Sequence, residues 1–272
     1  MWEKIQETVA FLKQKNNSTP EIGIILGSGL GNLIDDITIE LSIDYSDILH
    51  FPVSTVEGHT GRLIFGTLSG KNVIAMQGRF HYYEGYSMQE VTFPIRVMKF
   101  LGIKTLIVSN ASGGVNPSYE IGDIMIIKDH INMFPEHPLR GYNDSRLGPR
   151  FVNMSQPYNL NLIKNAETIA QKEGLNIKTG IYYGLSGPTF ETLAEYNMIR
   201  IVGADCVGMS TVPEVIVARH MDIDVFGISV ISDMGTSEGI LNVNHDEVLK
   251  AVANAEPKVR MLIQKLLHEI DR

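Results

Sequence analysis

The sequence is poor in cysteine and contains no long apolar run. Its one cysteine, Cys206, excludes an internal disulfide framework and suits a reducing compartment. Because Cys206 lies in the apolar stretch A-D-C-V-G-M, we expect a buried thiol rather than a nucleophile. No run is long enough to span a bilayer, and the first residues, M-W-E-K-I-Q-E-T-V, lack the apolar centre of a signal peptide. We therefore expect a cytoplasmic protein with no membrane partner.

Positive charge is also scarce. The chain has 23 Lys and Arg against 31 Asp and Glu, a net charge of −8, and its cations are scattered. A nucleic-acid partner is therefore disfavoured. The sequence has no H-E-x-x-H motif, no cysteine pair and no G-x-S-x-G elbow, so we expect no metal site and no serine-hydrolase chemistry.

No linker, repeat or low-complexity stretch divides the 272 residues, so we expect a single domain over 1–272. Apolar runs of strand length alternate with helical patterns. Strands are predicted at 22–26, 105–109, 123–127, 178–184, 204–208 and 224–233, with a hairpin at 62–68 and 71–77. Helices are predicted at 2–15, at 89–101 with a kink at Pro94, at 159–173, from Glu191 to about 202, near Pro213, and in a C-terminal stretch that Pro257 divides. The alternation predicts an α/β fold with a central mixed, largely parallel β-sheet flanked by helices.

The stretch G-R-F-H-Y-Y-E-G-Y at 78–86 follows a predicted strand, the position where open α/β sheets place ligands. Arg79 offers a planar fork of donors to an oxyanion, His81 can donate to the same anion, and Glu84 can orient the imidazole ring. A solvated loop with a structural salt bridge explains this stretch alone equally well.

Loops of small residues follow other predicted strands. G-S-G-L-G at 27–31 and N-A-S-G-G at 110–114 can present backbone N–H groups to an anion. Asn32 stands where a dinucleotide loop needs glycine, and the P-loop ending is missing, so a small anion is the better match. The alternatives are a plain tight turn at 27–31 and, for Ser210 with Thr211, a helix cap before Pro213. The candidate cradle for one phosphate or sulfate consists of Ser28, Arg79, His81, Asn110, Ala111 and Ser210.

A second group of residues combines apolar plates with carboxylates. Its members are Tyr83, Phe190, Glu191, Met209 and Asp233. Carboxylates accept from ring N–H or amino groups, and a protonated carboxyl can donate, so this group suits a flat heterocycle held beside the phosphate. The simpler interpretation of Glu191 is an acid that favours a helix dipole.

Several motifs together resemble the trimeric class of purine nucleoside phosphorylases. They are G-S-G-L-G at 27–31, T-V-E-G-H-T-G-R-L at 55–63, G-R-F-H-Y-Y-E-G-Y at 78–86, N-A-S-G-G at 110–114, D-H-I-N at 129–132, H-P-L-R-G at 137–141, G-P-T-F-E-T at 187–192 and V-G-M-S-T-V-P-E at 207–214. The resemblance implies a homotrimer that cleaves inosine and guanosine with phosphate, without a cofactor.

The resemblance also implies roles for single residues. Arg79, His81, Glu191 and Asp233 would be catalytic. Phosphate would contact Ser28, Arg79, His81, Asn110, the Ala111 N–H and Ser210, with His59 at the mouth of its site. Ribose would contact Tyr83, Met209 and His245, with Phe151 closing a neighbouring subunit's site. The base would meet Phe190, Glu191, Val207 and Asp233.

Two features depart from the family pattern. Asp233 stands where the 6-oxopurine enzymes usually have Asn, and the loop at 133–139 is shorter. Asp233 leaves open an adenosine-tolerant enzyme or a methylthioadenosine phosphorylase, although Glu191 and His245 disfavour the latter. A non-catalytic nucleoside-binding protein of the same fold is a more distant alternative, and Asn32 disfavours a dinucleotide oxidoreductase.

Overall fold

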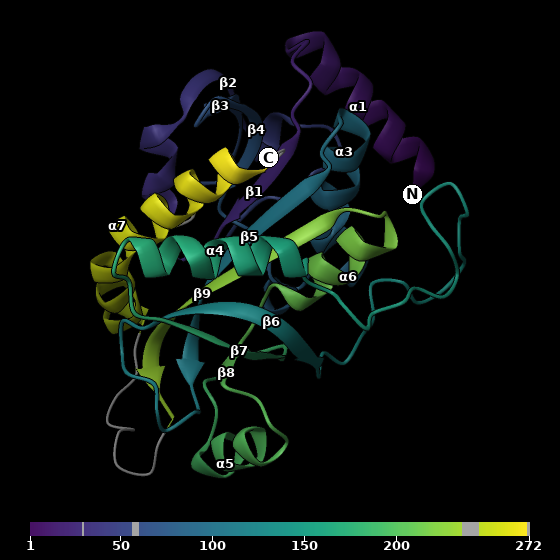
Figure 1. Cartoon of the computed structure of the whole chain (residues 1–272). Helices are drawn as coiled ribbons and strands as arrows, with labels where there is room; N and C mark the ends of the chain where they lie inside the picture. Colours follow the sequence, from purple (N-terminus) through teal and green to yellow (C-terminus); the bar gives the residue numbers. More distant parts are fainter. Residues whose placement is uncertain (29, 56–59, 236–244, 271–272) are drawn as a thin grey trace.

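One sheet organises the structure (Figure 1). The computed structural model describes residues 1–28, 30–55, 60–235 and 245–270, and within these ranges nine strands pair in the order β2-β3-β4-β1-β5-β8-β7-β6-β9. The strands are β1 (Ile22–Leu26), β2 (Thr38–Asp44), β3 (Arg62–Leu68), β4 (Lys71–Gln77), β5 (Thr105–Gly114), β6 (Ile124–Asn132), β7 (Ile177–Gly184), β8 (Cys206–Gly208) and β9 (Asp224–Met234). The predicted hairpin is confirmed as β3 and β4.

The sheet closes on itself at one end. Strand β5 pairs with β9 as well as with β8, and β9 pairs with β6, so β5, β8, β7, β6 and β9 form a closed circuit. Strands β4, β1, β5 and β9 run parallel, whereas β8 is antiparallel to β5 and β6 is antiparallel to β9. The predicted mixed, largely parallel sheet is confirmed. Its parallel strands bring their carboxyl ends to one edge.

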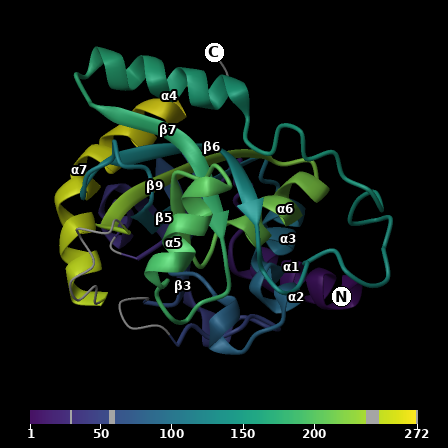
Figure 2. The ribbon, with the colours of Figure 1, turned by 90° about the horizontal axis from the view of Figure 1, so that it is seen from below.

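Helices cover the faces of the sheet. They are α1 (Trp2–Lys15), α2 (Met88–Val91), α3 (Phe93–Leu101), α4 (Leu160–Lys172), α5 (Leu193–Ile201), α6 (Val212–His220) and α7 (His245–Glu269). Helix α1 packs on α3, α3 on α6, and α4 on α7, and Figure 2 shows α4 beside α7 at one side of the molecule. Helix α5 lies near the ends of β7 and β8, at the lower end in Figure 1.

Three predicted element boundaries are wrong. Pro94 does not kink one helix; it stands in the first turn of α3, directly after the short α2, where its missing N–H has no helical partner to lose. Helix α7 continues through Pro257 without division. The strand predicted at 123–127 continues as β6 to Asn132, because it stays in parallel pairing with β7 as far as that residue.

The core agrees with the apolar runs in the sequence. All five residues of β1 are buried, as expected for a strand flanked on both sides in a parallel sheet. Cys206 is fully buried in β8, which confirms the predicted buried thiol, and burial raises the pKa of this thiol to about 12. Within the ranges described above, no helix combines the length and the apolar character needed to cross a membrane.

Candidate active site

The carboxyl ends of the parallel strands surround a cavity of about 290 Å³. Strands β4, β1, β5 and β9 each contribute residues at or just beyond their ends, and the segments after β7 and β8 supply the opposite wall. The lining residues are Ser28, Arg79, His81, Tyr83, Asn110, Ala111, Ser112, Gly113, Pro188, Phe190, Glu191, Val207, Gly208, Met209, Ser210, Ser232, Asp233 and Val248. Every site residue expected from the sequence is present here except His59, Phe151 and His245.

The three exceptions have different reasons. His59 and the side chain of His245 lie outside the described residues. The Phe151 side chain is 89% exposed and is not among the residues that line this cavity. Its expected place against a neighbouring subunit therefore stays a prediction.

At one end of the cavity, the turn after β1 approaches the backbone of β5 very closely. The Gly27 N–H donates to Ser109 Oγ over 3.3 Å. A Cβ atom on Gly27 would lie 2.5 Å from the Ser109 carbonyl oxygen and 2.9 Å from Asn110 Cα, distances that real Cβ atoms do not show. Glycine is therefore required at this position because the backbone of β5 fills the space a side chain would need.

We expect Gly27→Ala to lower the free energy of unfolding by about 1–3 kcal/mol, since the added methyl group must push two backbones apart. Gly31→Ala is the matched control, because apart from its neighbours along the chain no atom lies within 4 Å of the position its Cβ would occupy. Urea denaturation of both variants measures the difference. Equal stability of the two variants would contradict the close approach.

The expected anion loop at 110–114 is not a loop. These residues continue β5, which stays paired with β9 as far as Gly114 although its pairing with β1 ends at Val108. Asn110 is held at both ends of its amide: its Nδ2 donates to Thr211 Oγ1 over 2.8 Å, and its Oδ1 accepts from Ser229 over 2.6 Å. Asn110 and Ala111 thus line the cavity from an extended strand.

Thr211 occupies the N-cap position of α6, as predicted, but its side chain makes no capping bond. Its backbone has φ +68° and ψ −55°, a positive-φ conformation that is rare for a threonine. The side chain instead accepts from Asn110 and lies 3.1 Å from Ser210 Oγ. A strained residue directly after Ser210 therefore connects the start of α6 to β5.

Arg79 forms a buried ion pair that the sequence analysis did not find. Its Nε and Nη2 donate to the two carboxylate oxygens of Glu214 over 3.0 and 2.8 Å, and its Nη1 donates to the Ser109 carbonyl over 2.7 Å. The exposed fractions of Arg79 and Glu214 are 1% and 4%. The fork expected to face an oxyanion is thus engaged by Glu214 in α6, while the guanidinium still lines the cavity.

His81 is oriented by Glu84, as expected from their spacing. The Glu84 carboxylate lies 3.1 Å from His81 Nδ1 and accepts from the His81 backbone N–H over 2.7 Å. Burial opposes ionisation of Glu84, but hydrogen bonds from His81 and Thr55 outweigh it and lower its pKa to about 2. Burial lowers the pKa of His81 despite Glu84, which favours a neutral imidazole. The Tyr83 ring stacks on it with centroids 4.7 Å apart.

The other end of the cavity joins apolar walls to two carboxyl groups. Phe190, Val207 and Met209 line it beside Glu191 and Asp233. Burial raises the pKa of Glu191, and the charge of Asp233 adds to this effect. Burial also raises the pKa of Asp233, against hydrogen bonds from Ser232 and Tyr196. Both shifts make protonation of these carboxyl groups easier, and a protonated carboxyl can donate as well as accept.

Glu191 does not belong to the helix that follows it. Helix α5 begins at Leu193 and is capped by Thr192. The Thr192 side chain accepts from the Glu195 N–H, and the Glu195 carboxylate accepts from the Thr192 N–H. The capping acid is therefore Glu195, and the simpler interpretation of Glu191 as a helix-dipole acid is not supported. Tyr196, in the same helix, contacts Asp233 over 3.3 Å and was missed, because an aromatic residue in a helix is usually core.

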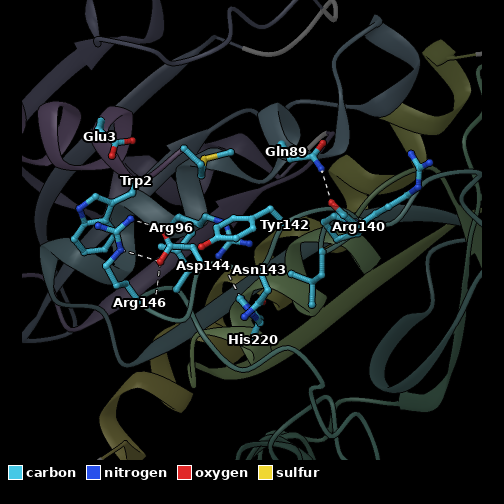
Figure 3. A pocket seen from close by; sticks show the side chains of 14 residues that line it. Trp2, Glu3, Gln89, Arg96, Arg140, Tyr142, Asn143, Asp144, Arg146 and His220 are labelled. Carbon is cyan, nitrogen blue, oxygen red and sulfur yellow. Dashed lines mark hydrogen bonds and ion pairs between the residues drawn. The ribbon is translucent and has the colours of Figure 1, made fainter.

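A larger cavity of about 460 Å³ lies elsewhere, near the N-terminus (Figure 3). None of the residues expected to act on phosphate or purine lines it. Arg146 bonds to Asp144 and lies 4.3 Å above the Trp2 ring, and Arg96 Nη1 lies 3.3 Å from His220 Nδ1. Its polar groups interact with one another, whereas the smaller cavity gathers groups from six separate strands and loops.

Within the described residues, no group of three or more His, Cys, Asp or Glu side chains could hold a metal ion. The smaller cavity is lined by one buried guanidinium, one imidazole, hydroxyls and two carboxyl groups with raised pKa values. Such an arrangement can bind an anion at one end and a heterocycle with N–H groups at the other.

Comparison with known proteins agrees with this chemistry. Residues 21–268 match the model of the phosphorylase superfamily. Purine nucleoside phosphorylase 1 of Geobacillus stearothermophilus is 52% identical, covering 98% of this chain and 97% of that protein. The purine nucleoside phosphorylase of Bos taurus is 46% identical, covering 99% and 96%.

Solved structures give the same result. The purine nucleoside phosphorylase of Schistosoma mansoni in complex with adenosine superposes with a TM-score of 0.93 at 42% identity, covering 99% of this chain and 98% of that chain. A structure of a schistosome purine nucleoside phosphorylase with hypoxanthine superposes with a TM-score of 0.93 at 41% identity, with the same coverage. The chain therefore belongs to the phosphorylase superfamily, among the purine nucleoside phosphorylases.

Proposed function

We propose that this enzyme cleaves inosine and guanosine, and their deoxy counterparts, with phosphate to give the free purine and (deoxy)ribose 1-phosphate. One observation carries the proposal: a single cavity joins the Arg79 and His81 end to the Glu191 and Asp233 end. A phosphate and a purine bound at these two ends would have the ribose between them, beside Tyr83 and Met209.

The reaction requires few participants. A phosphate oxygen forms a bond to the anomeric carbon as the bond from that carbon to purine N9 breaks, and the bonding electron pair leaves with the purine. The sugar passes through an oxocarbenium-like state that the adjacent phosphate anion stabilises. Arg79, His81, Ser28, Ser210, Asn110 and Ala111 would hold the phosphate. Phosphate is a co-substrate, and no cofactor takes part.

The two carboxyl groups would recognise and activate the purine. Glu191, when ionised, accepts from the N1–H of a 6-oxopurine and from the 2-amino group of guanine. Asp233, when neutral, donates its proton to N7 and so stabilises the leaving purine. Phe190 and Val207 would stack against the ring. The raised pKa of Asp233 supports this donor role.

Adenosine is the second candidate substrate. An ionised Asp233 can accept from the 6-amino group of adenosine. The Asn that usually stands at this position in the family could present either its carbonyl oxygen or its NH₂ group to the base. The similar Schistosoma mansoni enzyme was crystallised with adenosine, which supports a site of this fold holding a 6-aminopurine. Methylthioadenosine is disfavoured because Glu191 matches the 6-oxopurines.

We further propose a cytoplasmic homotrimer in which residues 1–272 form one domain. One continuous sheet supports the single domain, and one buried cysteine suits a reducing compartment. Phe151 is 89% exposed and is therefore accessible for contact with another subunit. In the trimer it would close the site of a neighbouring subunit.

An assay of purified protein with inosine, guanosine, adenosine and methylthioadenosine, each with and without phosphate, tests the proposed reaction. We expect phosphate-dependent release of hypoxanthine and guanine, with slower release of adenine. Cleavage of methylthioadenosine alone would replace the proposed substrate class. Binding of inosine without any phosphate-dependent cleavage would leave a nucleoside-binding protein.

A further inference from the structure

Tyr196 occupies a space that two glycines leave open beside Asp233. It lies in α5 and is 2% exposed. A Cβ atom on Gly235 would fall 2.1 Å from the Tyr196 ring, and one on Gly113 would lie 3.0 Å from Asp233 Oδ2 and 3.5 Å from the Tyr196 hydroxyl. The backbone around this hydroxyl thus fits a tyrosine in contact with Asp233.

The Tyr196 hydroxyl has one proton and lies beside two carboxyl groups. It donates to Asp233 Oδ2 over 3.3 Å. Burial raises the pKa of Tyr196, and the nearby carboxyl groups of Asp233 and Glu191 raise it further, so Glu191 is close enough to act on the same hydroxyl. A phenol has a single O–H and can stabilise only one of two anions at a time. We propose that Tyr196 is a positioning residue that ties the charge of Glu191 to that of Asp233 through its single hydroxyl proton.

The surroundings allow this coupling. Two carboxylates in one buried site repel each other, so the site favours one neutral and one ionised acid. The other oxygen of Asp233 accepts from Ser232 Oγ over 2.7 Å, but the same hydroxyl has the Ser112 carbonyl as a second acceptor at 3.2 Å. Ser232 can therefore follow a change in the charge of Asp233. Glu195 is the remaining acid whose charge acts on Glu191.

The consequence concerns the purine, and it rests on the proposed function. A 6-oxopurine presents an N1–H and so favours ionised Glu191, which leaves the proton of the pair on Asp233 for donation to N7. A 6-aminopurine has no N1–H and favours the opposite distribution. Through Tyr196, recognition at the N1 edge of the base would decide whether a proton donor stands at N7.

Tyr196→Phe tests the coupling, because phenylalanine keeps the ring against Gly235 and removes the hydroxyl. Tyr183→Phe is the matched control: Tyr183 is 4% exposed and belongs to the same small apolar cluster. We expect Tyr196→Phe to change the inosine-to-adenosine ratio of kcat/KM by about tenfold, the effect of one buried hydrogen bond. It should also shift the pH profile of kcat/KM, whereas Tyr183→Phe should change neither.

A titration that needs no turnover separates this inference from the proposed function. Carboxyl ¹³C signals of Glu191 and Asp233, assigned with Glu191→Gln and Asp233→Asn, should titrate as a coupled pair in the unaltered protein. In Tyr196→Phe they should titrate more independently. Independent titration in the unaltered protein, or an unchanged substrate ratio and pH profile in folded Tyr196→Phe, would overturn the inference. Absence of nucleoside cleavage with coupled titration would count against the proposed function alone.

Discussion

Replacement of Asp233 by asparagine should raise the inosine-to-adenosine ratio of kcat/KM by about ten- to a hundredfold. An amide group donates to inosine at any pH, whereas Asp233 donates only in its neutral form and, when ionised, accepts from the 6-amino group of adenosine instead. One mismatched buried polar contact costs about 1–3 kcal/mol, which corresponds to this range. Steady-state rates with both nucleosides at saturating phosphate measure the ratio.

The same variant should alter the pH dependence. Because burial raises the pKa of Asp233, its neutral, donating form exists below that pKa and disappears as the pH rises through it. Cleavage of inosine by the unaltered enzyme should therefore decline on the alkaline side, and this limb should flatten in Asp233→Asn. Asp224→Asn, at the exposed opposite end of β9, is the control. An unchanged substrate ratio would refute the role given to Asp233.

Arg79→Met should lower the free energy of unfolding by about 3–5 kcal/mol, because it leaves the Glu214 carboxylate buried without its partner. It should also abolish phosphate-dependent cleavage, since the cavity loses its buried cation. Urea denaturation and the phosphate dependence of the rate measure the two effects separately.

A double variant separates stability from function. Arg79→Met with Glu214→Leu replaces the ion pair by apolar side chains, which is often neutral for stability. We expect this protein to regain most of the lost stability and to remain inactive. Normal phosphate dependence in the double variant would show that Arg79 acts only on the fold. A loss below about 1 kcal/mol in the single variant would contradict the buried pair.

The sequence identified strand positions well, because buried parallel strands are short apolar runs. It could not show where pairing continues beyond such a run. The N-A-S-G-G stretch has little strand propensity, yet β9 and β8 pair with it and extend β5 to Gly114. Similarly, Pro257 disfavours a helix locally, but α7 continues through it while its apolar residues pack into the core.

The sequence predicted which types of side chain form the candidate site. It did not predict the roles of Glu214 and Tyr196, because these depend on partners that lie far away in the sequence. Glu214 follows Pro213 in a sequence typical of a first helical turn, and nothing local indicates that it pairs with Arg79. Tyr196 has the apolar neighbours of a core residue, and its hydroxyl finds Asp233 only after β9 and α5 are brought together. Hydrogen-bond partners far apart in sequence need the assembled sheet.

The buried thiol of Cys206 can report local opening of the sheet. It is the one cysteine in the chain, and its strand is paired with β5 and β7 directly beside Val207, which lines the purine end of the cavity. A thiol reagent can reach it only when these strands separate. The labelling rate of Cys206 therefore measures how often the sheet opens locally. Any molecule that binds the closed cavity should lower this rate in proportion to the fraction of protein it occupies.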